Sequence, residues 1–260
     1  GRAAREQGIR GNDVRFELEI SLEDAAMGRT MEIRVPAWDE CQSCHGTGCK
    51  PGTSRKTCPT CQGHGAVRVS NGLFQVHQTC PKCHGSGQII SDPCPNCQGV
   101  GKIRTTKVVE VKIPAGIDNG QTISLRGQGH AGKNGGPAGD LLVTVMVQPH
   151  DVFRRDGTAV FCEAPITFTQ AVLGAELEIP TIDGKVKYTI PEGTQTGTVF
   201  RLKGKGIPVL NGRGRGDQYV TVTIETPRNL NREQKDALRK FSETLNEGNY
   251  EKHRSFFKKR

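Results

Sequence analysis

Ten cysteines are the residues of this 260-residue chain best suited to chemistry, and eight of them fall into one repeated pattern. The pattern is Cys-x-x-Cys-x-Gly-x-Gly, and its copies begin at Cys41, Cys58, Cys80 and Cys94. Two thiolates in such a tight turn can bind one metal ion from the same side. The glycines permit positive φ and leave backbone amides free to point at sulfur. Four of these half-sites predict two four-sulfur sites, which is the closed geometry of structural zinc.

The spacing of the four copies favours a nested pairing. Eighteen residues separate Cys61 from Cys80, which lies within the window of about 15–20 residues found in a common zinc arrangement. The other two gaps, of 13 and 10 residues, are shorter. We therefore predict two Zn²⁺ ions per chain, an inner and an outer one. The predicted ligands are Cys58, Cys61, Cys80 and Cys83 for the inner ion, and Cys41, Cys44, Cys94 and Cys97 for the outer ion.

Other residues near the pattern are not expected to bind metal. Cys49 and Cys162 fit no copy and are interpreted as small buried or idle thiols. His45, His64 and His84 lie inside copies. Because four sulfurs already complete each ion, these histidines are interpreted as turn residues or as donors to the ligands.

Three other cysteine chemistries explain the pattern less well. Disulfides would account for an even count but not for four identical chelating turns followed by two glycines. Thioredoxin-like redox chemistry uses one Cys-x-x-Cys at the start of a helix, and the glycines here disfavour a helix. Iron–sulfur clusters use other spacings.

Composition bounds the architecture and the partners. Hydrophobic residues make up 34% and aromatic residues 5%, and there are 33 glycines, which favours many short strands and small cores. The length predicts more than one compact unit, and no apolar run is long enough to span a membrane. The net charge of +9 fits a nucleic-acid partner, an acidic partner or an ordinary soluble surface. Its densest run, at residues 252–260, is interpreted as a solvated tail.

The chain also repeats itself outside the cysteine-rich region. One set of matches lies 77 positions apart, and a second set lies 146 positions apart. The first set includes Ile113-Pro-x-Gly116 with Ile190-Pro-x-Gly193, and Gly139-Asp140 with Gly216-Asp217. The second set includes Ser21-Leu22 with Thr167-Phe168, and Glu32-Ile33 with Glu178-Ile179. One ancestral unit present twice, with the cysteine-rich region inserted in the first copy, accounts for both shifts.

Periodicity predicts a mainly β fold of two related small β-sandwich domains. Apolar residues alternate with polar ones around Val14–Ile20 and in three further short runs. Capping boxes at Ser21 and Thr167 predict short helices. After Thr226-Pro227, Asn231 can cap a longer helix with one apolar face, made of Ala237, Leu238, Phe241 and Leu245. That face could pair with a second copy of the chain or pack on its own domain.

Four Cys-x-x-Cys-x-Gly-x-Gly copies inserted in the first of two related β units resemble the DnaJ family of co-chaperones, in its zinc-containing class A. The resemblance runs from Arg10 through the last helix. Further family marks are Ile113–Gly116, Gly139–Leu141, Phe153–Gly157 and Ala171–Gly174. The His-Pro-Asp triplet of the family's J domain does not occur in the sequence. The resemblance therefore implies a substrate-binding portion that holds clients without stimulating the ATPase of the DnaK partner.

The resemblance also implies a division of the chain. Residues 1–11 would be the remnant of a Gly/Phe linker, and residues 12–37 with 104–148 would form the first β domain, which binds substrate. Residues 38–103 would form an extended zinc module of β-hairpins. Residues 149–227 would form the second β domain. Residues 228–260 would form the C-terminal helix and tail, which dimerise.

The function implied is that of a non-enzymatic co-chaperone. It would bind unfolded or misfolded polypeptides, prevent their aggregation and deliver them to DnaK and its exchange factor GrpE during heat and other stress. A role in DNA replication would run through remodelling of protein complexes. The protein would be a cytoplasmic, clamp-like homodimer that contacts its clients through an open sheet edge and a shallow apolar groove. The groove walls would include Val14, Ile33, Val35, Val109 and Val143, which on pattern alone are ordinary core residues.

Two other classes of protein compete with this interpretation. A thiol–disulfide oxidoreductase could use the Cys-x-x-Cys turns, but zinc-bound thiolates are poor catalysts while the metal stays. A zinc-dependent nucleic-acid binder would fit the positive charge, yet no base-reading helix and few aromatic residues accompany the cysteines. Direct binding of nucleic acid and of membranes is therefore not expected.

Overall fold

The computed structural model describes residues 8–71, 74–133 and 135–258 and shows a mainly β chain, as predicted. The chain divides into two compact units. Unit 1 comprises the residues up to Asp151 together with Ile207–Arg215, and unit 2 comprises Val152–Gly206 and Gly216–Arg260. Ile207–Arg215 fell within the expected second domain, but this segment lies with unit 1, where Leu210 packs against the core. In the described part of the chain, no helix is long and apolar enough to cross a membrane.

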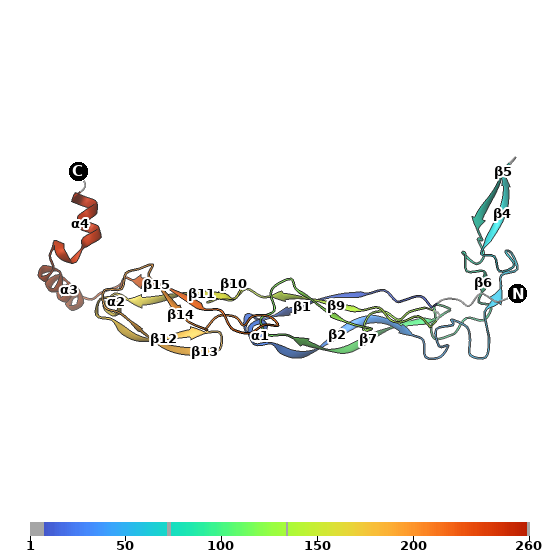
Figure 1. Ribbon diagram of the computed structural model, residues 1–260, viewed down its shortest axis with the longest axis horizontal. Coiled ribbons are helices and arrows are strands. Elements are labelled where there is room, and N and C mark those ends of the chain that lie inside the picture. The colour runs from blue at the N-terminus through green and yellow to red at the C-terminus, as the bar shows by residue number, and fades with distance from the viewer. Residues whose placement is uncertain (1–7, 72–73, 134, 259–260) are drawn as a thin grey trace. The chain divides into compact units, whose positions relative to one another are not determined.

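Outside the cysteine-rich insertion, the described part of unit 1 contains two sheets and one short helix (Figure 1). In the first sheet, β1 lies parallel to β9, and β9 pairs with β8 in antiparallel fashion. In the second, β2 and β7 form a long antiparallel ribbon. The elements are β1 (Val14–Ile20), α1 (Leu22–Met27), β2 (Arg29–Glu40), β7 (Lys102–Ile113), β8 (Thr122–Leu125) and β9 (Leu141–Val147).

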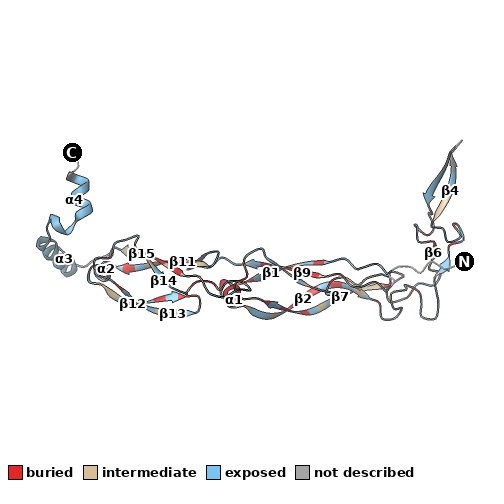
Figure 2. Ribbon diagram, viewed as in Figure 1, coloured by how far each residue is buried: buried red, intermediate tan, exposed pale blue. Residues whose placement is uncertain are grey.

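The core of unit 1 fills the space between these sheets and is made mainly of branched aliphatic residues. Figure 2 colours the buried stretches of these strands red. The five residues expected to form groove walls are all members of this core, and none is more than 9% exposed. They lie on the inward face of their strands and belong to the packed core. The exposures are 9% for Val14, 6% for Ile33, 0% for Val35, 7% for Val109 and 0% for Val143.

Unit 2 repeats this plan. The strand pair β11–β15 is parallel, like β1–β9, and β12–β13 is an antiparallel ribbon, like β2–β7. The capping box predicted at Thr167 is present, whereas Ser21 caps α1 only through its side chain, which accepts the N–H of Asp24. The elements are β10 (Arg154–Asp156), β11 (Ala159–Thr167), α2 (Phe168–Leu173), β12 (Ala175–Thr181), β13 (Gly184–Ile190), β14 (Val199–Leu202) and β15 (Gln218–Glu225). The internal repeat is therefore one of topology as well as of sequence.

The C-terminal segment of unit 2 is helical. Asn231 caps α3 (Arg232–Thr244) and forms the predicted capping box with Gln234. A short 3₁₀ turn, η1 (Glu247–Asn249), leads to α4 (Glu251–Lys258). None of the residues of α3 is buried.

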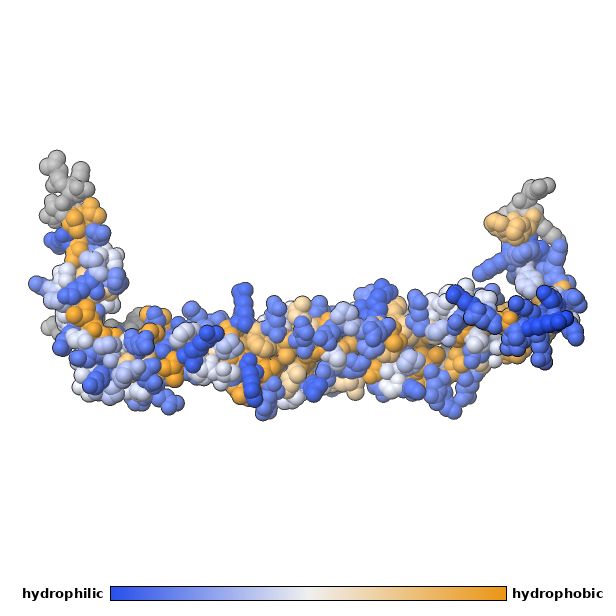
Figure 3. All heavy atoms as spheres, turned by 180° about the vertical axis from the view of Figure 1, so that it is seen from behind, coloured by the Kyte–Doolittle hydropathy of each residue, from blue (hydrophilic) through white to orange (hydrophobic). Residues whose placement is uncertain are grey.

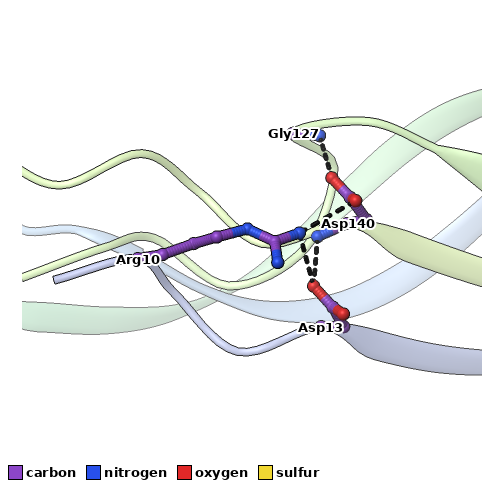
Figure 4. A network of polar contacts seen from close by, with 4 residues as sticks. All are labelled: Arg10, Asp13, Gly127 and Asp140. Carbon is purple, nitrogen blue, oxygen red and sulfur yellow. Dashed lines mark hydrogen bonds and ion pairs between the residues drawn. The ribbon is translucent and has the colours of Figure 1, made fainter.

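An aspartate network ties the start of β1 to the start of β9 (Figure 4). The Asp140 carboxylate accepts the Gly127 N–H at 2.9 Å and pairs with Arg10 at 2.8 Å, while the Asp140 N–H donates to Asp13 at 2.7 Å. The Gly127 N–H holds the pKa of Asp140 below its ordinary value, with a smaller contribution from Arg10. The repeat reproduces the arrangement 77 positions later, where Asp217 accepts the N–H of Gly204.

We expect the charge of Asp140 to stabilise the fold at neutral pH. A carboxyl whose pKa is lower in the folded than in the unfolded chain, where it is about 3.9, stabilises the fold above that pH. The stabilisation is lost as pH falls through the folded pKa. Asp140→Asn should therefore lower Tm at pH 7 by about 2–4 °C, and the difference should shrink towards pH 3. Thermal unfolding followed by circular dichroism measures this, with the exposed Asp151→Asn as control. An equal deficit at pH 7 and pH 3 would contradict the assignment.

Candidate metal centres

The cysteine-rich region is inserted between β2 and β7 and contains two small hairpin-like pairings. The strand β3 (Lys56–Thr57) pairs with β6 (Gln88–Ile89), and β4 (Ala66–Asn71) pairs with β5 (Phe74–Thr79). Both pairings are antiparallel and bring the second and third cysteine copies together. Because β2 and β7 pair along twelve positions, the first and fourth copies also meet, at the base of the insertion.

The structure groups the eight cysteines into two sets with the nested pairing. In each set the four sulfurs lie within 4.8 Å of one another, and all eight residues are at most 7% exposed. One set is Cys41, Cys44, Cys94 and Cys97, and the other is Cys58, Cys61, Cys80 and Cys83.

The distances between the sulfurs fit a tetrahedral ion. The measured separations are 3.9 Å for Cys41–Cys94 and 3.6 Å for Cys44–Cys97. In the inner set they are 3.8 Å for Cys58–Cys80 and 3.6 Å for Cys61–Cys83. Four sulfurs about 2.3 Å from a zinc ion would stand about 3.8 Å apart, whereas a disulfide requires about 2.05 Å. The donor set and its spacing therefore fit zinc.

The chain after each cysteine pair turns back so that amides point at sulfur, as the glycines predicted. The N–H of Gly48 lies 3.4 Å from the sulfur of Cys44, and the N–H of Gly101 lies 3.2 Å from that of Cys97. The residue that follows the second cysteine has positive φ in all four copies, although none of the four is a glycine. These residues are His45, Gln62, His84 and Gln98, with φ from 47° to 54°.

The two copies in each centre hold each other through crossed backbone contacts. The N–H of Cys58 donates to the carbonyl of Gly87, and the N–H of Cys80 donates to that of Gly65, both at 2.9 Å. A Cβ on Gly87 would collide with the carbonyl of Gly63, and a Cβ on Gly65 would collide with that of Gly85. The last glycine of each copy is therefore required by close approach of the partner copy as well as by its φ of about 70°.

The thiols of one turn differ in acidity. Burial raises the pKa of Cys58, but the backbone N–H groups of Cys61 and Thr60 lower it more, to about 6. Burial and the Cys83 thiol raise the pKa of Cys61 to about 11. The outer set shows the same contrast, with a pKa of about 7 for Cys41 and about 11 for Cys44. Binding of a cation would release the remaining thiol protons.

The other cysteines and the histidines lie outside both sets. Cys49 is buried, and its thiol lies 3.9 Å from the Thr47 carbonyl. Cys162 is buried in unit 2, where burial raises the pKa of its thiol. His45, His64 and His84 are exposed, and their side chains are not among the grouped ligand atoms.

A contact that sequence reasoning missed lies at the root of the insertion, on the outer edge of β2. The backbone N–H of Trp38 donates to Nδ1 of His130 at 2.9 Å, and the N–H of Ala131 donates to the Trp38 carbonyl at 2.8 Å. These two hydrogen bonds, which we call the Trp38 cap, occupy the outward backbone groups of Trp38. Trp38 and His130 lie 92 positions apart in the sequence, so no local sequence signal could have indicated the contact.

Comparison with known proteins agrees with this arrangement. The family model described as "DnaJ C terminal domain" matches residues 14–227, and that described as "Chaperone protein DnaJ C-terminal region" matches residues 233–259. The chain belongs to the DnaJ C-terminal domain family. Similar curated proteins include "Chaperone protein DnaJ" of Ruminiclostridium cellulolyticum, 55% identical over 254 residues, and that of Acetivibrio thermocellus, 52% identical over 261 residues.

A third DnaJ relative, from Bordetella petrii, is 54% identical over 242 residues. These alignments cover 96%, 99% and 93% of this chain, and 67%, 68% and 65% of the respective relatives. The chain therefore spans about two thirds of the length of the DnaJ relatives that it matches.

Proposed function

We propose that this chain is the client-binding part of a zinc-containing DnaJ co-chaperone. It holds unfolded polypeptides in the cytoplasm, prevents their aggregation and delivers them to DnaK, which works with GrpE. This activity serves the response to heat and other stress, and DNA replication through the remodelling of protein complexes. The main support for this proposal is the pair of four-cysteine sets, which are inserted in the first of two repeated β units. The relatives at 52–55% identity, which are named chaperones, support it.

Zinc is the proposed metal, with two ions per chain held by the eight grouped cysteines. When bound, zinc cross-links thiolates without redox chemistry and stabilises the fold. The grouped thiols are buried, so they offer no accessible nucleophile to a disulfide substrate, which disfavours an oxidoreductase. Among the described residues between β2 and β7 there is no helix, which disfavours reading of bases in a DNA groove.

The outer edge of β2 is the proposed client site. Trp38 directs its backbone groups away from β7, towards His130 and Ala131. The β2–β7 register is uninterrupted, so every second residue shares this direction. Thr30, Glu32 and Arg34 therefore direct N–H and C=O groups outward. Pro36 directs only a carbonyl outward, consistent with its lack of an N–H.

These outward groups make no hydrogen bond to any described residue, so an extended client could pair with them regardless of its sequence. The Trp38 cap ends the free stretch. Phe16 and Met31 pack against the core of the same unit and are only partly buried, so they leave apolar surface for a client. Figure 3 shows hydrophobic residues reaching the surface along the β units. The five core residues first expected as groove walls then support this edge from beneath.

Arg34→Pro tests whether client binding uses the backbone of β2. The substitution removes one outward N–H and is expected to weaken binding about 5–10-fold, the effect of one lost hydrogen bond of about 1 kcal/mol. Arg34→Ala keeps the N–H and should bind with an affinity within about 2-fold of the parent's, because the backbone N–H and not the arginine side chain pairs with the client. The measurement is fluorescence anisotropy with a fluorescein-labelled peptide of alternating Leu and Thr. Equal affinity of the two variants would rule out strand pairing at this edge.

We also propose that a second copy of the chain covers the apolar face of α3. Together with α2, this face lines a groove of about 630 Å³. Leu238 is 46% and Phe241 41% exposed, and Ala237 lies in the same groove. Leu245 lines the neighbouring hollow. Such a dimer would let two weak client sites grip one unfolded chain. A monomer at micromolar concentration in sedimentation equilibrium would contradict the dimer.

A further inference from the structure

Unit 2 contains an edge equivalent to the proposed client site, on strand β12. The 146-residue repeat aligns Thr30, Glu32 and Arg34 of β2 with Glu176, Glu178 and Pro180 of β12. The β12–β13 register is also uninterrupted. Pro180 has no N–H, and its carbonyl accepts a hydrogen bond from outside the ribbon, so these three positions face outward. The second edge therefore offers two outward N–H groups where the first offers three.

A buried glutamine occupies the remaining carbonyl. The Nε2 of Gln218, in β15, donates to the Pro180 carbonyl at 2.8 Å and to the Cys162 sulfur at 3.3 Å. Gln218 is 0% exposed, and its Oε1 has no partner among the described residues. One side chain therefore joins β15, β11 and β12. An incoming strand would have to break these hydrogen bonds to pair at Pro180.

Unit 1 lacks every part of this arrangement. The repeat aligns Gln218 with Leu141 and Cys162 with Phe16. Leucine has no group that could donate to a carbonyl, and the Arg34 carbonyl accepts no hydrogen bond from a described residue. Phe16 is partly exposed, whereas Cys162 is buried. The same sheet edge is thus open in unit 1 and closed in unit 2.

We propose that Gln218 and Pro180 form a lock that closes the β12 edge to extended polypeptides, so that each chain holds one client strand, at β2. The lock rests on the proposed function, because it assumes that client strands pair with β2. It determines which of two equivalent edges binds, and its removal exposes a second client site. Occupying the Pro180 carbonyl also shortens the unpaired stretch of β12 that could template aggregation.

The decisive experiment compares peptide stoichiometry in the full chain and in a variant with Pro180→Arg and Gln218→Met. Arginine restores the outward N–H, and methionine fills the space without donating. Isothermal titration with the alternating Leu/Thr peptide should give one peptide per chain for the parent and two for the variant. Two for the parent, or one for a folded variant, would overturn the lock. No binding by the parent would instead refute the proposed function.

A second measurement does not depend on how the double variant folds. The photoreactive residue p-benzoylphenylalanine replaces Glu32 in one preparation and Glu178 in another. Both positions are exposed and are equivalent in the repeat. Cross-linking of the same peptide should be at least about 5-fold stronger from position 32, as expected for the loss of one or more strand hydrogen bonds. Equal cross-linking from both positions would overturn the lock. Cross-linking from neither would refute client binding at these edges.

Discussion

Cys58→Ser is expected to lower the zinc content of the purified protein from two ions per chain to one. The four sulfurs of the inner set lie within 4.8 Å of one another. Serine does not supply the thiolate that a closed four-sulfur site requires. The outer set shares no residue with the inner one, so its ion should remain. Metal analysis by inductively coupled plasma mass spectrometry measures the content directly.

The matched control is Cys49→Ser, because Cys49 is a buried cysteine of the same insertion that belongs to neither set. This variant should keep two ions. Far-ultraviolet circular dichroism of Cys58→Ser should remain that of a β protein, since the β2–β7 ribbon does not depend on the inner set. Retention of both ions by Cys58→Ser, or loss of both, would show that the two centres are assigned wrongly or fold as one.

The sequence predicted the metal centres well because their information is local. Each Cys-x-x-Cys-x-Gly-x-Gly copy specifies its own turn, and the long gap between Cys61 and Cys80 favoured the grouping that the structure shows. The crossed contacts between copies were not predictable. Whether a Cβ on Gly87 meets the carbonyl of Gly63 depends on how two separate turns face each other.

The repeat and the alternation predicted the two β units but not which of their surfaces would be open. Alternation identifies one apolar face of a strand, and both a groove wall and a core residue satisfy it. The direction of the backbone groups of β2 became clear only from the contact between Trp38 and His130. The placement of Leu210 in unit 1 likewise depends on tertiary packing that leaves no periodic signal.

Val35→Asp is expected to unfold unit 1 and not merely to block a groove. Val35 is 0% exposed in the core of unit 1. A carboxylate there would be buried among aliphatic side chains without a partner, at a cost of about 3–5 kcal/mol. That is a large fraction of the total stability of a domain, which is about 5–15 kcal/mol. Urea unfolding followed by circular dichroism should show the first transition at a much lower midpoint.

Val108→Asp on the facing strand β7 is the matched control. Val108 is 60% exposed and lies opposite Arg34. A carboxylate at this position therefore stays hydrated and lies opposite the positive charge of Arg34. Its effect should stay within about 0.5 kcal/mol. Unchanged stability of Val35→Asp would contradict the burial of this strand face. If Val35→Asp does unfold unit 1, its loss of client binding would report loss of the fold, whereas Arg34→Pro with Arg34→Ala isolates the edge. The backbone of β2, and not the side chains beneath it, is therefore where client recognition has to be tested.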